Sequence, residues 1–385
     1  MRGRSPILAV CGTRPEAIKL SPVVRSLRQR GHPVIVVATG QHPALATDML
    51  REAGLEAEID LGVHQAGASP AQLLAAILPA MQPVLAAYRP PLVMVQGDTV
   101  SALAAALAAN YARIPVAHVE AGLRTQNRDE PFPEELHRCL ITSLASLHFA
   151  PTRRAAAALA AEGVDAAAVH LCGNSGIDAV LATAARLADD VDLQGRMRER
   201  FRFVDEARRP LVLATVHRRE NIGSRLNSIA AALARLAGFC EAEIVLPLHP
   251  NPAVAGKLKA RLGGLGGVHL LPAIDHASMV WLMQHCRLLL TDSGGLQEEA
   301  PALGLRVLVL RETTERPEAV ECGVAALVPL RADAIVAATR AALLQPLPAP
   351  CFPFGDGLAA PRIADAIGKW LGVPASTTVL SGDFR

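Results

Sequence analysis

The chain has 385 residues, of which 51% are hydrophobic and only 3% are aromatic, and its formal net charge is +2. Because a single hydrophobic core stops growing at about 250–300 residues, this length predicts two α/β domains. The small charge and the scarcity of aromatic rings argue against a nucleic-acid partner, which needs a basic surface or a platform for stacked bases.

The cysteines and the lengths of the apolar stretches indicate the cellular compartment of the protein. The seven cysteines are odd in number and widely spaced, without a C-x-x-C pair, so we expect neither a disulfide framework nor a zinc site. The apolar run that ends at Gly12 is too short for a secretory signal, and no apolar stretch reaches the length of a membrane-spanning helix. These features predict a soluble cytoplasmic protein that does not enter a membrane.

Short apolar runs alternate with longer Ala- and Leu-rich segments of helical period. This alternation is typical of parallel sheets covered on both faces, and it predicts two Rossmann-like, doubly wound domains. The composition changes near Leu171 to Leu181, so we place the first domain at residues 1–172 and the second at 173–358. The expected strands lie in 6–10, 32–40, 91–98, 114–122 and 147–152, then in 210–217, 242–250, 267–273, 286–294 and 305–312.

Charged residues gather where the strands of the first domain end, and ligands of open parallel sheets bind at that edge. The first strand runs into "CGTRPEAIKLSP" with Arg14 and Lys19, the third ends at Asp98, and the fourth ends at Glu120. Any one of these could be a helix cap or a first-turn acid. Three successive strand ends together favour a ligand site.

The segment "DEPFPEELHR" adds Glu134 and Glu135 at the start of a helix. Taken alone, it favours an ordinary helix opening with a surface pair between Glu135 and Arg138.

In the second domain, His217 directly follows a strand. Ser293-Gly294-Gly295 opens a helix that contains Glu298 and Glu299. Two glycines at a helix N-terminus let backbone N–H groups approach a phosphate, although a plain tight turn is the alternative. Arg316 could supply a countercharge or contact a ribose.

Several motifs are missing. The turn after the first strand reads GTRPEA rather than G-x-G-x-x-G, so no NAD site is predicted. Neither H-E-x-x-H nor a P-loop occurs, and Asp190 and Asp192 fall in a solvated connecting helix. We therefore expect no cofactor and no metal.

The sequence resembles the non-hydrolysing UDP-N-acetylglucosamine 2-epimerases of bacteria from Ile7 to about Trp370. The motifs that carry the resemblance are "GTRPEAIKLSP", "TGQH", "QGDT", "HVEAGLRT", "PFPEELHR", "GNSGID", "HRREN", "LHPNP", "TDSGGLQEEAP" and "TTERPEAV". The resemblance implies the two-lobed GT-B fold with a cleft between the lobes, a C-terminal helix at about 359–385 that returns to the first lobe, and a homodimer.

The resemblance also implies the activity: reversible conversion of UDP-N-acetylglucosamine (UDP-GlcNAc) to UDP-N-acetylmannosamine (UDP-ManNAc) for polysaccharide precursors. Its catalytic residues would be the acid/base carboxylates Asp98, Glu120 and Glu134, together with His217 and Lys19. Its substrate-binding residues would be Arg14, Lys19, Asp98, Glu120, His217, Met279, Ser293, Gly294, Gly295, Glu299 and Arg316.

Two departures from the family accompany these expectations. His276 and Met279 stand where relatives commonly carry a Tyr and a Phe near the uracil, and Pro43-Ala44 follow "TGQH" where relatives with a second, activating substrate site show longer polar side chains. The alternatives are an epimerase acting on another UDP-2-acetamido sugar, a hydrolysing variant that releases ManNAc, and a non-catalytic nucleotide-sugar-binding protein. A GT-B glycosyltransferase is an analogy of fold alone.

Overall fold

The computed structural model describes residues 5–41, 43–64, 67–218, 221, 223–249 and 252–372, with backbone alone for 43–46 and 252–253. Arg219, Glu220 and residues 373–385 lie outside these residues. The chain forms two compact units: unit 1 comprises Met1–Ala179 and Phe354–Arg385, and unit 2 comprises Val180–Pro353.

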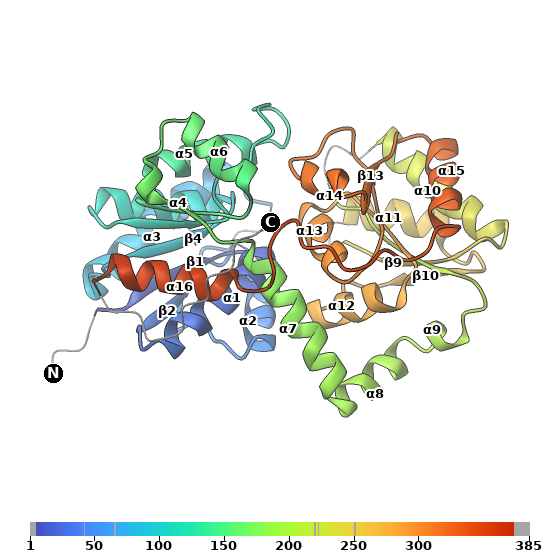
Figure 1. Cartoon of the computed structure of the whole chain (residues 1–385), viewed down its shortest axis with the longest axis horizontal. Coiled ribbons are helices and arrows are strands. Elements are labelled where there is room, and N and C mark those ends of the chain that lie inside the picture. The colour runs from blue at the N-terminus through green and yellow to red at the C-terminus, as the bar shows by residue number, and fades with distance from the viewer. Residues whose placement is uncertain are drawn as a thin grey trace. The chain divides into compact units, whose positions relative to one another are not determined.

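Unit 1 is built on a parallel sheet with the strand order β3-β2-β1-β4-β5-β6-β7. Helices cover both faces of this sheet (Figure 1). Its strands are β1 Ile7–Cys11, β2 Val34–Ala38, β3 Ile59–Asp60, β4 Val93–Gln96, β5 Val116–Val119, β6 Leu147–Ala150 and β7 Val169–Leu171. Its helices are α1 Arg14–Gln29, α2 Pro43–Glu52, α3 Pro70–Tyr88, α4 Val100–Tyr111, α5 Glu134–Leu144, α6 Arg153–Ala161, a 3₁₀ turn at Ala166–Ala168, the start of α7 Ser175–Asp189, and α16 Ala359–Trp370.

Alternate residues of the unit 1 strands point to opposite faces of the sheet and pack into two different core layers. In β1, Ile7 and Ala9 pack with residues of α1, α2 and α16, whereas Leu8 and Val10 pack with residues of α3 and α4. This division follows from the two-residue period of a strand and explains why the strands read as continuous apolar runs.

Helix α16 comes from the end of the described chain but packs alongside α1 (Figure 1). The carboxylate of Asp178, in α7, accepts the backbone N–H groups of Ala359 and Ala360 at 3.2 and 2.8 Å, and so satisfies the first turn of α16. Burial raises the pKa of Asp178 to about 6, against the lowering effect of these hydrogen bonds.

Unit 2 has a second parallel sheet, with the order β10-β9-β8-β11-β12-β13. One face carries α10, α11 and α15, whose apolar residues pack against Val212 and Ala214 of β8. Its strands are β8 Leu211–Thr215, β9 Glu243–Pro247, β10 Val268–Leu271, β11 Leu288–Thr291, β12 Val307–Val309 and β13 Ala325–Leu327. Its helices are the remainder of α7, α8 Val191–Arg200, α9 Phe203–Glu206, α10 Ser224–Gly238, α11 Pro252–Leu262, α12 His276–His285, α13 Gly294–Ala302, α14 Pro317–Glu321 and α15 Ala332–Leu343.

Helix α3 corrects one expectation from the sequence. Among the described residues, this helix alone is long and apolar enough to cross a membrane by length and composition, whereas we expected no such stretch. Its buried residues Ile77, Met81 and Leu85 belong to the core layer formed with β1 and β4, so α3 packs here as a helix of the α/β unit. Much of its remaining surface is exposed.

Candidate active site

Both sheets have a switch point. There, two central strands lie side by side, and the chain passes from one of them to the next strand in one direction along the sheet and from the other in the opposite direction. In unit 1 the switch point lies between β1 and β4, and in unit 2 it lies between β8 and β11. Ligands of doubly wound sheets bind outside the carboxyl ends of strands at such points. The predicted residues Asp98 and His217 come just after β4 and β8, at these ends.

The turn between β1 and α1 is organised by Glu16, which is fully buried. Its Oε2 accepts the backbone N–H groups of Gly12 and Thr13 at 2.9 and 2.7 Å, and its Oε1 accepts the hydroxyl of Thr99 at 2.7 Å. Burial raises the pKa of Glu16, and these hydrogen bonds oppose that rise. Glu16 therefore occupies the N–H groups that a glycine-rich turn would offer to a dinucleotide, and it does so from within the chain.

Glycine is required at position 12 of this turn. A Cβ atom there would lie 2.1 Å from Oγ of Ser101 and 2.2 Å from Oγ1 of Thr39. Arg14, which is half-buried, then begins α1, and Lys19 lies on the buried face of the same helix.

Glu120, at the end of β5, is the centre of a buried polar cluster. Its Oε1 accepts hydrogen bonds from the ammonium of Lys19 and from Nδ2 of Asn174, the latter at 3.0 Å, and its Oε2 accepts one from the side-chain amide of Gln96. Glu120 has a φ of 65°, in the left-handed region that a non-glycine residue rarely adopts. The structure thus joins two predicted site residues, Lys19 and Glu120, in one ion pair.

Asp98 lies after β4 and is held by α5. Its Oδ2 pairs with Arg138 at 2.5 Å, and its backbone oxygen lies 2.8 Å from Nδ1 of His137. Arg138 also forms an ion pair with Glu135 at 3.1 Å, as we expected. Both side chains are buried, so the prediction that this pair lies on the surface is wrong. Glu134 begins the same helix, one turn before Arg138, and is partly exposed.

A neutral histidine supports the loop before Asp98. The Nε2 atom of His118, in β5, lies 2.8 Å from the backbone oxygen of Gly97, and the ring is fully buried. Burial lowers the pKa of His118 to about 4, although its hydrogen bond to Gly97 acts in the opposite direction. The ring is therefore uncharged at neutral pH.

In unit 2, the buried carboxylate of Asp292 gathers the loop that follows β8. It accepts hydrogen bonds from Nδ1 of His217, from the backbone N–H of Arg218 and from the side-chain amide of Asn221, each at 2.9 Å. Burial alone would raise the pKa of Asp292, but these hydrogen bonds and the charge of His217 outweigh it and lower the pKa. The His217 side chain remains 32% exposed, so its outer edge is open to a ligand.

The predicted Ser293-Gly294-Gly295 turn begins α13 as expected, with Ser293 at the N-cap. A Cβ on Gly294 would lie 2.6 Å from Nη1 of Arg316. That guanidinium is buried and forms ion pairs with Glu298, at 2.5 Å, and with Glu315. Arg316 therefore packs directly under the turn and is fixed there by two carboxylates.

Glu299 and Met279 lie on neighbouring helices of unit 2. Oε2 of Glu299, on α13, lies 4.0 Å from Nε2 of His276, the first residue of α12, and Nδ1 of His276 lies 3.3 Å from the hydroxyl of Thr183. Met279, one turn further along α12, is partly buried.

Sequence reasoning missed four residues that hold the predicted ones in place. Asp292 could have been found, because it directly follows a strand, as Glu120 does. Glu16, Gln96 and Asn174 carried no comparable signal, because their roles follow from contacts that only the folded structure shows.

Comparisons with known proteins give this geometry a context. A family model described as UDP-N-acetylglucosamine 2-epimerase matches residues 25–368. The chain is 42% identical over 368 residues to a probable UDP-N-acetylglucosamine 2-epimerase of Ralstonia nicotianae, and 40% identical over 371 residues to the UDP-N-acetylglucosamine 2-epimerase of Salmonella typhimurium. Each alignment covers 94% of this chain and 98% of the relative.

Solved structures agree. The UDP-GlcNAc 2-epimerase from Neisseria meningitidis, bound to UDP-GlcNAc, superposes with a TM-score of 0.90 at 36% identity, over 94% of this chain and 100% of the other. The two parallel α/β sheets found here are those of a GT-B fold.

Proposed function

The chain belongs to the UDP-N-acetylglucosamine 2-epimerase family, and on that premise we propose that it is an isomerase that interconverts UDP-GlcNAc and UDP-ManNAc by inverting C2 of the sugar. The observation that carries this proposal is the pairing of Lys19 with Glu120 at one switch point and of His217 with Asp292 at the other. A protein that only binds a nucleotide sugar has no need of such acid/base pairs.

The chemistry explains why these residue types are needed. The proton on C2 is not next to a carbonyl group, so a carboxylate alone cannot remove it. When UDP leaves C1, the positive charge that develops on the ring makes the C2 proton acidic, and its loss gives a 2-acetamidoglucal. UDP then adds back to C1 while a proton arrives on the opposite face of C2. Atoms balance without a redox cofactor.

We assign departure of the diphosphate to unit 2. Because Asp292 accepts Nδ1–H of His217, the other ring nitrogen, Nε2, is oriented by the fold and can donate a proton or a hydrogen bond to a phosphate oxygen. The N-terminus of α13, at Ser293, Gly294 and Gly295, adds backbone N–H groups and the helix dipole. Removing one donor to a developing anion typically costs about 10²–10³ in rate.

We assign proton transfer at C2 to the carboxylates of unit 1. Delivery on two faces requires at least two carboxyl groups in different protonation states, and Asp98, Glu120 and Glu134 supply three. Lys19 forms an ion pair with Glu120, and Lys19 and Arg14 both add positive charge toward the substrate. Glu299, Arg316 and Met279 are assigned to the nucleoside, Arg316 acting from beneath the α13 turn.

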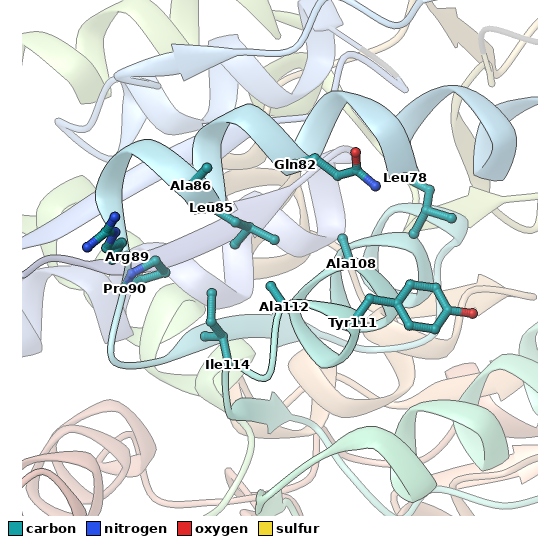
Figure 2. Close-up of a pocket in the computed structure, with 10 residues that line it drawn as sticks. All are labelled: Leu78, Gln82, Leu85, Ala86, Arg89, Pro90, Ala108, Tyr111, Ala112 and Ile114. Carbon is teal, nitrogen blue, oxygen red and sulfur yellow. The ribbon is translucent and has the colours of Figure 1, made fainter.

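We also propose that the protein is a cytoplasmic homodimer. All seven cysteines lie in the described ranges as free thiols, which fits a reducing compartment. Helix α3 exposes apolar surface, and a pocket of about 470 Å³ lies between α3 and α4, lined by Leu78, Leu85, Tyr111 and Ile114 among others (Figure 2). Tyr111 is 72% exposed, and a second copy of the chain would cover this surface.

The dimer has its own test, light scattering on the wild type and on Tyr111→Asp. We expect a dimeric mass for the wild type and a smaller one for the variant, whereas a monomeric wild type would refute the proposed assembly.

The activity is tested by incubating the purified chain with UDP-GlcNAc and separating the products by anion-exchange chromatography. We expect UDP-ManNAc to accumulate to an equilibrium that is also reached from UDP-ManNAc. Free ManNAc with UDP would indicate the hydrolysing reaction, and unchanged UDP-GlcNAc would indicate a binding protein. Conversion of a different UDP-2-acetamido sugar alone would assign the enzyme to that substrate.

A further inference from the structure

Glu16 holds two separate turns of unit 1 with its two carboxylate oxygens. Oε2 accepts hydrogen bonds from the backbone N–H groups of Gly12 and Thr13 and from the hydroxyl of Thr13, at 2.9, 2.7 and 2.8 Å. Oε1 accepts the hydroxyl of Thr99 at 2.7 Å, although Thr99 is 83 positions away in the sequence. The first turn follows β1 and the second follows β4, the two strands that pair at the switch point. Glu16 therefore bridges the switch point.

The hydroxyl of Thr99 has a place on both sides of this bridge. Thr99 is the N-cap of α4, and its Oγ1 accepts the backbone N–H of Ala102 at 3.0 Å while its proton is donated to Glu16. Because the hydroxyl both accepts and donates, it is held in one orientation. The start of α4 is thus fixed to the turn after β1, which leads into α1 with Arg14 and Lys19.

Asp98 directly precedes Thr99, so the bond to Glu16 fixes the chain immediately after this predicted site residue. Other groups hold the same loop: Arg138 pairs with the carboxylate of Asp98, and His118 supports the backbone before it. If the bond to Glu16 is lost, those contacts remain, but the backbone on the α4 side of Asp98 is free to shift. A small displacement of the carboxylate is the expected result.

We propose that Glu16 is a positioning residue for Asp98, and that through Thr99 it holds this carboxylate where proton transfer at C2 requires it. The inference rests on the proposed function. Glu16 has no exposed surface, so it acts through Thr99 and not on the substrate. Because a misplacement of about 1 Å can cost about 100-fold in rate, loss of one such bond is enough to lower kcat. KM for UDP-GlcNAc should change little, since the groups assigned to the nucleoside and the diphosphate belong to unit 2.

Two single variants break the bridge with side chains of similar shape. In Glu16→Gln, the amide oxygen can still accept the N–H groups of Gly12 and Thr13, but the NH₂ group then faces Thr99, whose proton has lost its acceptor. Thr99→Val has no hydroxyl at all. We expect each variant to lower kcat by about 10–100-fold in steady-state kinetics with UDP-GlcNAc. Thr99→Ser keeps the hydroxyl and should keep the wild-type kcat.

Thr152→Val is the matched control, because Thr99→Val also removes the N-cap of α4. Thr152 caps α6 in the same way: its hydroxyl accepts the backbone N–H of Ala155 at 3.1 Å, and the residue is buried. Both valine variants should melt at a lower temperature than the wild type, because each loses a cap. Only Thr99→Val should lose turnover, and an equal loss of kcat in Thr152→Val would overturn the proposal.

The double variant Glu16→Gln/Thr99→Val shows whether the two residues act through one bond. If they do, its kcat should be no lower than that of the less active single variant, whereas two independent defects would multiply. The proposal is overturned by multiplied losses, by wild-type kcat in Thr99→Val, or by a loss that falls on KM alone. Should Glu16→Gln fail to fold, the comparison of Thr99→Val with Thr99→Ser and Thr152→Val decides.

The wild type separates this inference from the function on which it rests. A wild type that epimerises UDP-GlcNAc beside equally active bridge variants would overturn the role of Glu16 alone. A wild type that converts no UDP-sugar would overturn the proposed function and this inference with it.

Discussion

Nδ1 of His217 lies 2.9 Å from Oδ1 of Asp292, a side chain with no exposed surface. The carboxylate accepts, so Nδ1 carries a proton and the ring is oriented, with Nε2 at its outer edge as the nitrogen that takes up the second proton and can then donate it. The two residues come from the ends of β8 and β11, the strands on either side of the unit 2 switch point. The topology of the sheet therefore creates the pair.

Asp292→Asn should lower kcat by about 10²-fold, because the amide can no longer accept every N–H that converges on it and His217 loses its fixed tautomer. The effect should fall on kcat more than on KM, as measured by steady-state kinetics. Asp333→Asn is the control, since Asp333 is an exposed partner of Arg235 and its loss should leave turnover unchanged. Wild-type kcat in Asp292→Asn would contradict the assigned role.

Glu120→Gln should lower turnover by about 10²–10⁴-fold, because an amide cannot act as acid or base. It should also destabilise the protein by about 3–5 kcal/mol, since the buried ammonium of Lys19 loses its counter-charge. The double variant Lys19→Met/Glu120→Gln separates the two effects. This variant should recover stability in denaturant titrations but not activity. If activity recovered as well, Glu120 would not be the residue that transfers the proton.

Gly294→Ala should weaken the binding of UDP, measured by calorimetry, by about tenfold or more. The added methyl group would stand 2.6 Å from Arg316, whose guanidinium is tied to Glu298 and cannot easily move aside. Gly195→Ala is the matched control, because a Cβ there meets no atom within 4 Å and alanine is the better helix former. Equal affinities of the two variants for UDP would argue against a phosphate site at the α13 turn.

Acid should destabilise unit 1 through His118. The ordinary pKa of 6.5 applies in the unfolded chain, whereas burial lowers it to about 4 in the folded protein. Between these pH values the unfolded chain binds more protons than the folded one. The stability that the neutral His118 ring contributes is therefore complete above pH 6.5 and is lost as the pH falls toward 4, which lowers the free energy of unfolding by about 3 kcal/mol.

His118→Gln tests this effect, because the amide can still donate to Gly97 but does not titrate. Its free energy of unfolding should fall by about 3 kcal/mol less than that of the wild type between pH 7 and pH 4. Asp178 acts in the opposite direction, since its pKa is raised to about 6 in the folded state, but it is common to both proteins and cancels in the comparison. Parallel pH profiles of the two proteins would contradict the assignment.

The sequence predicted the central strands and their covering helices, because the strands lie within continuous apolar runs and the helices within segments of clear helical period. It missed β3, β7 and β13, all of which lie at the edges of their sheets. These strands have two or three residues, too few to show a period, and they exist only because a neighbouring strand provides hydrogen-bond partners.

The site was predictable where position in the chain determines position in space. Asp98, Glu120 and His217 follow buried strands, and the carboxyl ends of parallel strands lie at one edge of a sheet. The partners of these residues were not predictable, since Lys19 meets Glu120 across 101 positions of sequence and Asn174 reaches the same carboxylate from the start of α7. Such contacts depend on three-dimensional packing, which no spacing rule encodes.

The central claim is that C2 exchanges its proton with a carboxyl group while UDP is detached. Incubation of the protein with UDP-GlcNAc in D₂O, followed by proton NMR, tests it most directly. We predict that the C2 proton signal of the UDP-ManNAc formed is absent because deuterium has replaced it. UDP-ManNAc that retains its original C2 proton, or a UDP-GlcNAc spectrum that does not change, would contradict it.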